Sequence, residues 1–492
     1  MQKSTALEII KTFTPGDIER FEDFLKSPFF NKNSNVIRLF NLLKKYSPDY
    51  VSSALDKQMM WRELFPDKAY NYGSMKNLIF ELKKLAAKYI TIDELGRNKL
   101  EEDEILVRAL GKRNIPKFFI NKVSEIEKKY RIENLQNLET ELEDYFTYMF
   151  KIKWMKHAYL RFYNQRLAKD EDLIAYTALM TGSFIIYTSM YYNNVMAQSL
   201  DVNFTPEHNA VVSLVETLKS TSTAEILKAI SKFSIAAGKI TNLHWLKTKV
   251  VMKDASEEDF FQLRDEVYRN TDMLPVLSLK GFLTSIVNSA AMLDSPDINI
   301  SKERIDALKL RMKKKMIAHD DGRVYLPELL QYFWSASNLN DYEVIEKLIK
   351  EHVSKSNNEK KDNVMNCGEI FFCIRDKKFN EALELISTVT PESFMMKVHL
   401  RMLKTRCLYM INDYETFLYE RDSLNHFLKS SKSLSEKNIR QLKDYFEKVN
   451  RMFRLKRNFE GSEFKKLNEE IVSNVNYPVW MREELSVIKI VR

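Results

Sequence analysis

The sequence predicts an all-α protein in which an N-terminal helical module precedes an α-solenoid. Glycine and proline, which punctuate strands and tight turns, number only 10 and 11 in 492 residues, well below average usage. Leu, Lys, Glu, Ile and Met, by contrast, are abundant, and most of these residues favour helices. A joint between apolar helical runs recurs in the C-terminal half, and its period is that of a two-helix unit.

The internal repeat lies between residues 325 and 430. Its joints read Asn340-Asp341-Tyr342-Glu343, then Lys377-Lys378-Phe379-Asn380-Glu381, then Asn412-Asp413-Tyr414-Glu415. The aromatic residues of these joints are 37 and then 35 residues apart, and apolar runs flank each joint. A two-helix unit of this size cannot bury its apolar face alone, so we expect the units to stack on their neighbours.

At these joints the chain resembles tetratricopeptide repeats, whose turn carries an Asp-Tyr-Glu-Glu-Ala-like run. The best match is Phe379-Asn380-Glu381-Ala382. That family has a small residue three positions past the aromatic; this chain has Ile345, Ala382 and Phe417, so one joint follows the pattern. The resemblance covers about a fifth of the chain and implies a degenerate TPR-like solenoid that binds a protein or peptide partner on its concave face. The alternative is a set of ordinary helical hairpins in a large bundle.

Composition shifts along the chain predict four parts. Residues 1–96 form the helical module and 97–240 an aromatic-rich helical segment. Residues 241–430 hold the repeats, and 431–492 a basic capping helix with a tail. The first boundary is placed after Gly96 because the charge becomes dense there.

Start and stop signals define the first three helices. Thr14-Pro15-Gly16-Asp17 is a helix start, with a hydroxyl at the N-cap, proline at N1 and an acid at N3. Ser27-Pro28 ends that helix, and a second helix follows Asn33-Ser34. A third helix is predicted from about Asp56 to Leu64, with its methionines and Leu64 facing inward.

The fourth helix, from Met75 to Thr91 with Ser74 as its cap, has two different faces. One face is an apolar stripe at i, i+3, i+4 and i+7 spacing. The other carries four lysines, Lys76, Lys83, Lys84 and Lys88. One hypothesis is that this is the second helix of a helix-turn-helix, with the lysines contacting DNA; the other is that these lysines are only solvated.

Two resemblances concern the same region. The run from Trp61 to Asp67, followed by a capped basic helix, is similar to the winged-helix module of bacterial activators that precedes a TPR-like domain. This implies a DNA-binding regulator. The motifs Ser27-Pro28-Phe29-Phe30-Asn31 and Leu64-Phe65-Pro66 resemble a family of uncharacterised bacterial helical proteins. That second resemblance implies no activity.

Aromatic residues are dense between residues 104 and 167 and alternate with Lys and Arg. Such a pattern suits stacking on single-stranded nucleic acid, but Phe146, Phe150, Trp154 and Tyr159 lie near helical spacing, so we expect core packing. From Leu173 to Leu200 there is no charge, a length sufficient to span a bilayer. Its Thr, Ser, Asn and Tyr residues favour a buried pair of helices instead. With no signal peptide visible in residues 1–11, we expect a cytoplasmic protein without membrane contact.

The helix from about Glu436 to Arg457 is predicted to cap the solenoid through an apolar seam with steps of three and four residues. Its other faces carry basic residues, including Arg440, Lys448, Arg451 and Arg454. This basic surface suits a phosphate or an acidic partner, although a run of charge is usually a solvated face.

Signatures of catalysis are missing. The chain has no phosphate-binding glycine loop, HExxH, GxSxG or kinase motif. Its Cys and His residues are dispersed, which predicts buried thiols and neither metal nor cofactor. His-carboxylate pairs, for example around His319-Asp320-Asp321, could assemble in three dimensions, but short turns rich in Asp are common without catalysis. The net charge of +9 is mild and permits nucleic acid without requiring it. We therefore expect a non-enzymatic scaffold for a protein or peptide, with a DNA-binding regulator as the alternative; the sequence does not define an oligomeric state.

Overall fold

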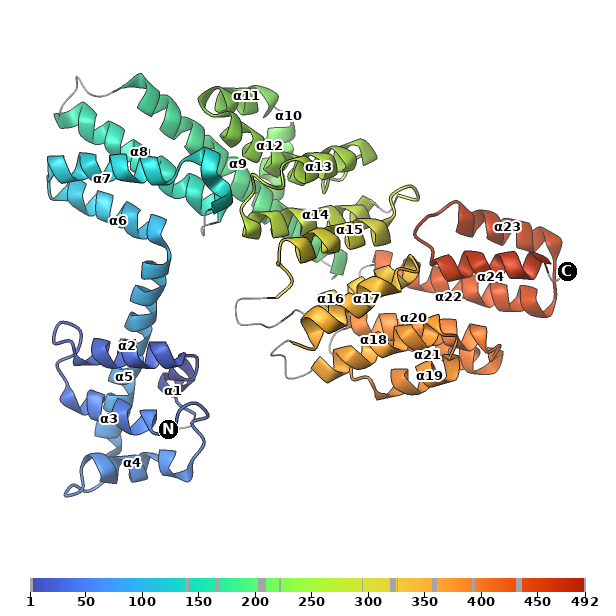
Figure 1. Cartoon of the computed structure of the whole chain (residues 1–492), viewed down its shortest axis with the longest axis horizontal. Helices are drawn as coiled ribbons and strands as arrows, with labels where there is room; N and C mark the ends of the chain where they lie inside the picture. Colours follow the sequence, from blue (N-terminus) through green and yellow to red (C-terminus); the bar gives the residue numbers. More distant parts are fainter. Residues whose placement is uncertain are drawn as a thin grey trace. The chain divides into compact units, whose positions relative to one another are not determined.

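The computed structural model describes every residue except 1–2, 138–140, 164–168, 202–208, 221–222, 294, 319–323, 325, 356–360, 392–393, 431–435 and 491–492. The described residues form helices throughout and no β-strand, apart from one isolated bridge between Ala318 and Val324. The all-α prediction is confirmed. The chain divides into two compact units, residues 1–119 and 120–492, which are described separately (Figure 1).

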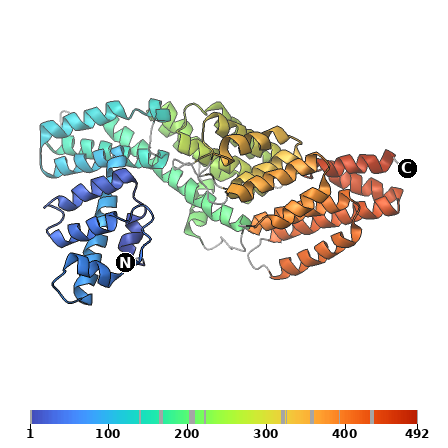
Figure 2. The same ribbon diagram turned by 60° about the horizontal axis from the view of Figure 1, so that its bottom comes forward.

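The first unit, blue in Figures 1 and 2, has a long helix at its centre. Its elements are α1 (Thr5–Ile10), α2 (Pro15–Lys26), α3 (Ser34–Lys44), η1 (Ser53–Leu55), α4 (Lys57–Leu64), α5 (Tyr72–Arg97) and α6 (Lys99–Lys112), and α7 (Pro116–Lys129) crosses the division. The core is formed where α5 packs against α1, α2 and α3. Because one long helix contacts three others, the opposite face of α5 is left to solvent.

Local signals placed α2, α3 and α4 correctly, whereas α1 was not predicted. The Thr14 side chain accepts a hydrogen bond from the Asp17 backbone N–H, and the Asp17 carboxylate accepts one from the Thr14 N–H, which completes a capping box. Two details were wrong. The α5 cap is Asn71, whose Oδ1 accepts from the Ser74 N–H at 2.8 Å, so Ser74 lies inside the helix. Met59 is 51% exposed, because Met60 and Leu64 take the buried side of α4.

The second unit begins with η2 (Ile132–Asn137), α8 (Leu142–Tyr163), α9 (Asp170–Asp201), α10 (Ala210–Ser220), α11 (Thr223–Phe233), α12 (Ile235–Lys249), α13 (Glu257–Arg269), α14 (Val276–Leu293) and α15 (Ile300–Lys313). Helix α9 packs against α8 and α12. A Cβ atom at Gly182 would lie 2.8 Å from Cε1 of Phe146, so a glycine is needed where α8 and α9 approach.

Two sequence predictions for this region were wrong. The uncharged stretch is one helix, α9, and not a pair of helices. The hydroxyls of Thr177 and Thr181 donate hydrogen bonds to backbone carbonyls one turn earlier, at 2.8 and 2.9 Å, so these polar residues do not require a turn. Trp154, expected in the core, is 52% exposed, since it lies two residues past buried Ile152 and points away from it. Two segments are long and apolar enough to cross a membrane, Asp170–Met196 and Val276–Leu293. In each of them, 44% of the most apolar 18-residue stretch is buried inside the protein.

The C-terminal elements are α16 (Leu326–Asn338), α17 (Tyr342–Leu348), the π-helical η5 (Ile349–Val353), α18 (Lys361–Arg375), α19 (Phe379–Thr388), α20 (Phe394–Met410), α21 (Tyr414–Ser430), α22 (Glu436–Arg457), α23 (Gly461–Val472) and α24 (Val479–Ile490). The segment expected to be a tail thus forms two more helices. Both pack on α22, as Figures 1 and 2 show, so α22 is not the terminal element.

The three joints of the internal repeat share one backbone geometry. Asn340, Lys377 and Asn412 each follow a helix in the left-handed region, with φ of 57°, 60° and 61°. At each joint the next N–H donates to the carbonyl five residues earlier, at 2.8 to 3.0 Å: Asp341 to Ala336, Lys378 to Cys373 and Asp413 to Leu408. This is the pattern of a Schellman turn, so the repeated sequence encodes a repeated helix ending.

The aromatic residue of each joint begins the following helix, α17, α19 or α21. Tyr342, Phe379 and Tyr414 are partly buried. Three residues further on, Ile345, Ala382 and Phe417 are fully buried at 0% exposure. The position is therefore a core position at all three joints, whatever the size of its side chain.

A candidate binding pocket in the second unit

An open pocket of about 430 Å³ lies in the second unit between α16, α20 and α22. Helices α16 and α20 begin the first and the third of the helix pairs in this region, and α22 follows the third pair along the chain. The pocket lining comprises Ile300, Trp334, Asn338, Met402, Arg440, Gln441, Asp444, Tyr445, Asn474, Asn476, Tyr477 and Pro478. Its volume falls within the range of ligand-binding pockets in proteins.

The loop between α23 and α24 forms one wall because it is tied to a distant segment. The Asn476 amide nitrogen donates to the Ser295 carbonyl at 3.0 Å, and its Oδ1 accepts from the Ile300 N–H at 3.0 Å. The Val475 N–H donates to the Pro296 carbonyl at 3.1 Å. These bonds join residues about 180 positions apart, so the wall exists only in the folded chain.

Aromatic rings line the pocket. Trp334 stacks on His399 with ring centroids 5.4 Å apart and planes 16° from parallel. Burial, reinforced by the positive charge of Arg304, lowers the pKa of His399 to about 4, so this imidazole is neutral at pH 7. The Tyr445 hydroxyl donates to the Met402 carbonyl at 3.2 Å, which fixes that ring between α20 and α22.

The one carboxylate of the lining is already neutralised. Asp444 accepts from the Lys448 ammonium at 2.7 Å and from the Tyr477 hydroxyl. Lys448 is buried and also pairs with Glu470 at 3.2 Å. Asp444 therefore adds little net negative charge to the pocket.

Two arginines near the pocket, neither of which lines it, lack carboxylate partners among the described residues. Arg304 lies one turn after Ile300 on α15, and its Nη1 donates only to Ser335 Oγ at 2.9 Å. Arg406 lies one turn after Met402 on α20, and its Nη1 donates to Ser337 Oγ at 3.3 Å. The Nε atoms of both are buried without a hydrogen-bond partner. Burial lowers the pKa of Arg304, which shows that its charge is poorly solvated.

Neither Arg304, Arg406 nor the exposed Arg440 makes an ion pair within the described part of the chain. Burial raises the pKa of Glu484, although the positive charges of Lys456 and Arg406 act to lower it. An unpaired buried cation is costly unless something neutralises it. Arg440 is the arginine that lines the pocket, and its exposed guanidinium suits an anionic group held beside the aromatic rings.

The predicted basic surface of α22 is not one surface, which corrects the sequence prediction. Arg440 is exposed at the pocket, but Lys448 is buried against Asp444 and Glu470. Arg451 is partly buried and pairs with Glu463 and Glu470. Arg454 is exposed and lines a separate hollow of about 630 Å³ beside Tyr414. Glu463 and Glu470 of α23, with Asp444 of α22, neutralise Lys448 and Arg451, whereas Arg440 and Arg454 stay exposed.

The other predicted residues lie elsewhere. Tyr342, Phe379 and Ala382 pack in the core between α16 and α20, and the Tyr414 hydroxyl donates to Asn450 Oδ1 at 3.1 Å. Lys76, Lys83, Lys84 and Lys88 are all exposed on α5. The seven residues 65–71 join α4 to α5, whereas a helix-turn-helix has a turn of three or four. His319-Asp320-Asp321 lies outside the described residues.

Sequence reasoning missed Arg304, Trp334, His399 and Arg406. The sequence held one indication of them, because an arginine at a core position of an apolar helix needs a partner or a ligand. No local pattern, however, shows that these helices contact one another. The three cysteines are buried and free, as expected. Among the described residues no cluster of His, Cys, Asp or Glu has the make-up of a metal site.

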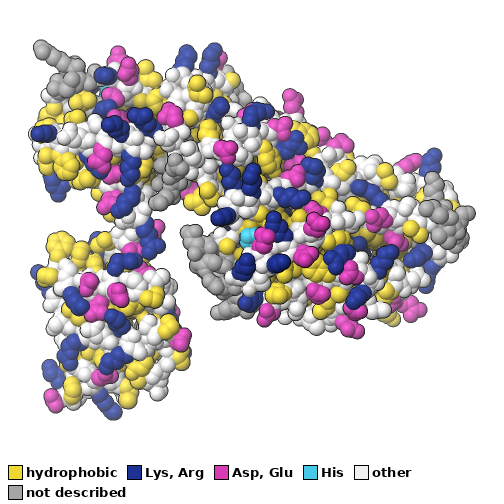
Figure 3. Space-filling view, viewed as in Figure 1, with side chains coloured by type: hydrophobic (Ala, Val, Ile, Leu, Met, Phe, Trp, Pro, Cys, Tyr) yellow, Lys and Arg dark blue, Asp and Glu magenta, His cyan; other side chains and the backbone are white. Residues whose placement is uncertain are grey.

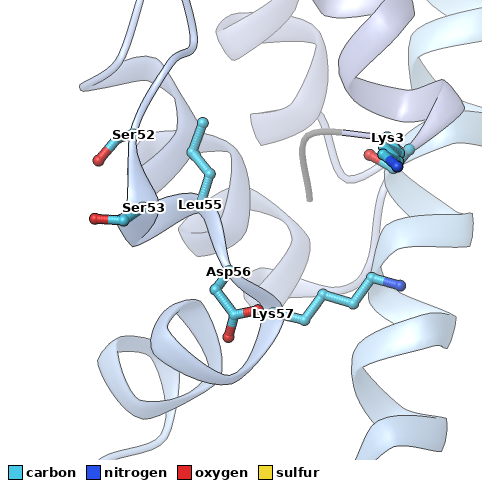
Figure 4. A pocket seen from close by; sticks show the side chains of 7 residues that line it. Lys3, Ser52, Ser53, Leu55, Asp56 and Lys57 are labelled. Atoms are coloured by element: carbon cyan, nitrogen blue, oxygen red, sulfur yellow. The ribbon is translucent and has the colours of Figure 1, made fainter.

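A further pocket of about 370 Å³ in the first unit is less informative (Figure 4). Its polar side chains already cap helices: Asp56 Oδ1 accepts from the Gln58 N–H at 2.8 Å, and Ser52 Oγ from the Ala54 N–H at 3.1 Å. Those backbone bonds lower the pKa of Asp56. These groups serve the fold of the loop.

No protein-family model, curated protein or solved structure matches this chain. The resemblances of the N-terminal motifs and of the repeat joints therefore stay predictions, and the pocket geometry is the main guide to function.

Proposed function

We propose that this protein is a non-enzymatic, cytoplasmic scaffold whose C-terminal helices form a degenerate TPR-like solenoid, and that it binds a peptide segment of a partner protein in the pocket between α16, α20 and α22. The observation that carries the proposal is the pocket itself, which has aromatic walls and an exposed arginine, Arg440, in its lining.

The helix pairing supports the solenoid interpretation. Pairs α16–α17, α18–α19 and α20–α21 are each joined by the same left-handed turn, and consecutive pairs pack together. Because α16 and α20, from the first and third pairs, line one pocket together with α22, a bound segment would contact more than one repeat. That arrangement suits an extended peptide better than a flat protein surface.

The pocket also defines the chemistry of the segment. Trp334 and Tyr477 offer ring faces for an apolar or aromatic side chain, while Arg440 is exposed and has no ion pair among the described residues. Arginine binds carboxylates through two parallel hydrogen bonds. We therefore expect an acidic residue next to a large apolar residue in the bound segment.

A test starts from a displayed library of random peptides selected on the full chain. The expected result is enrichment of acidic residues beside aromatic or large aliphatic ones. Labelled enriched peptides are then titrated with wild type, with Arg440→Glu and with Lys443→Glu, an exposed charge reversal on the same helix outside the pocket. Arg440→Glu should weaken binding at least tenfold and Lys443→Glu should change it little. No enrichment, or equal binding by all three proteins, would refute the proposal.

A further inference from the structure

The exposed face of α5 combines lysines with aromatic rings. Tyr72, Lys76, Phe80, Lys83 and Lys84 lie within one arc of the helix, since they recur at intervals of three and four residues. The buried face opposite, which includes Leu78 and Leu82, packs into the core of the first unit. Phe80 and Tyr72 gain nothing from that core.

Both aromatic rings are exposed to solvent, and a lysine ammonium lies near each of them. Phe80 is 55% exposed and Tyr72 is 59% exposed. The Lys84 Nζ lies 5.4 Å from the centre of the Phe80 ring, and the Lys57 Nζ lies 5.7 Å from that of Tyr72. With a rise of about 1.5 Å per residue, the two rings are spaced by about 12 Å along the helix.

The charge of this face is positive and is not compensated locally. Lys76, Lys83, Lys84 and Lys88 are exposed and make no ion pair within the described residues. Glu81 lies at the edge of the face, where its carboxylate accepts from the Asn33 amide at 2.6 Å, and Glu94 lies six residues beyond Lys88 towards the C-terminal end of α5. Elsewhere on the molecule, Figure 3 shows basic and acidic side chains interspersed over the visible surface.

We propose that this face of α5 binds single-stranded nucleic acid, with Phe80 and Tyr72 stacking on unpaired bases and the four lysines neutralising phosphates. Exposed rings between cations are the arrangement by which proteins hold single strands, since every base has a face on which a ring stacks. In duplex DNA the bases are stacked on each other and are not available to Phe80. The proposal is independent of the peptide pocket, which lies in the other unit.

The test titrates fluorescent single strands of about 20 nucleotides, oligo(dT) and oligo(U), with the full chain. A duplex of the same length and vesicles of anionic phospholipid serve as competing probes. Four phosphate contacts on a single strand predict a salt slope near −2.8, so binding should weaken about 50-fold between about 50 and 200 mM salt. The two single strands distinguish DNA from RNA as the source of the bases.

Variants separate stacking from charge. Phe80→Ala should weaken single-strand binding about tenfold while leaving the salt slope near its original value. Lys83→Glu with Lys84→Glu should abolish binding, and the matched control Lys112→Glu with Lys117→Glu, exposed charge reversals in the first unit outside α5, should retain it. Equal or tighter binding of the duplex, preference for the vesicles, an unchanged affinity of Phe80→Ala, or no binding at low salt would each overturn the proposal.

Discussion

The arginines around the pocket and the lysines of α5 show how differently the same charge acts in two regions. Arg304 and Arg406 bury guanidinium atoms without a carboxylate partner, whereas Lys76, Lys83, Lys84 and Lys88 extend into water. A solvated lysine costs the fold almost nothing and conveys little alone. A buried unpaired arginine is a standing cost to stability. Location, more than residue type, decides what a cation indicates about function.

The largest test of this comparison uses two arginines seven residues apart on α15. Arg311 is 3% exposed and bonds to Glu328 and the Tyr332 hydroxyl, at 2.7 Å for the latter. Arg311→Met removes the ion pair of the partly buried Glu328 carboxylate and a buried donor to the Tyr332 hydroxyl, and should cost about 3–5 kcal/mol in the free energy of unfolding. Arg304→Met removes a cation that has no ion pair and should stabilise the second unit by about 1 kcal/mol. Chemical denaturation measures both; equal losses would contradict the distinction.

Titration of the pocket gives the next largest effect. The pKa of His399 is lowered to about 4, first by burial and then by Arg304. Because the unfolded chain binds the proton near pH 6.5, stability should be full above that pH and fall as the pH drops towards 4, by up to about 3 kcal/mol. His244, whose pKa burial lowers well below 6.5, adds in the same direction.

His399→Phe, which keeps a ring beside Trp334, should reduce this pH dependence. Unfolding curves recorded between pH 4 and 7 measure it, with His426→Phe as a control at an exposed histidine. An unchanged pH profile in His399→Phe would show that the imidazole is not held neutral.

A smaller effect concerns the start of α5. Asn71→Ala removes the side chain that accepts from the Ser74 N–H and should cost about 1 kcal/mol. Ser74→Ala should change stability by a few tenths of a kcal/mol, since Ser74 contributes its backbone N–H to the cap. If Ser74→Ala lost more stability than this in thermal unfolding, Ser74 would be the cap, as the sequence analysis predicted.

The smallest effect is expected on the exposed side of α5. Lys83→Ala should change the free energy of unfolding by less than about 0.5 kcal/mol, although its neighbour Leu82→Ala should cost about 2–5 kcal/mol, because Leu82 is fully buried. The contrast between adjacent residues is measurable in one set of denaturation curves. A destabilised Lys83→Ala would mean that the lysine face supports the fold.

Much of the fold was predictable because its signals are short-range. The capping box of Thr14 and Asp17 and the apolar stripe of α5 need only neighbouring residues. Errors arose where two local solutions compete. Asn71 and Ser74 are both good caps, and the hydroxyls of α9 suggested a turn that the helix does not need. Trp154 shows the limit of spacing arguments, since helical spacing does not say how wide a buried face is.

The candidate pocket was much less predictable. Arg440 was identified on charge alone, and Lys448 was grouped with it although Asp444 and Glu470 neutralise Lys448 in the fold. The residues that define the pocket, from Ile300 to Tyr477, come from five separate segments. Each of them looks like ordinary helix packing when only its neighbours are considered.

The sequence by itself determined the helices, their caps and the shared turn at Asn340, Lys377 and Asn412, because hydrogen bonds within a few residues decide those features. Only the tertiary structure decided which cations are solvated, paired or buried without a partner. That distinction depends on contacts between residues up to about 180 positions apart. One example is the hydrogen bond from the Asn476 amide to the Ser295 carbonyl, which positions one wall of the pocket. Electrostatic free energy depends on surroundings, and surroundings exist only after the helices pack.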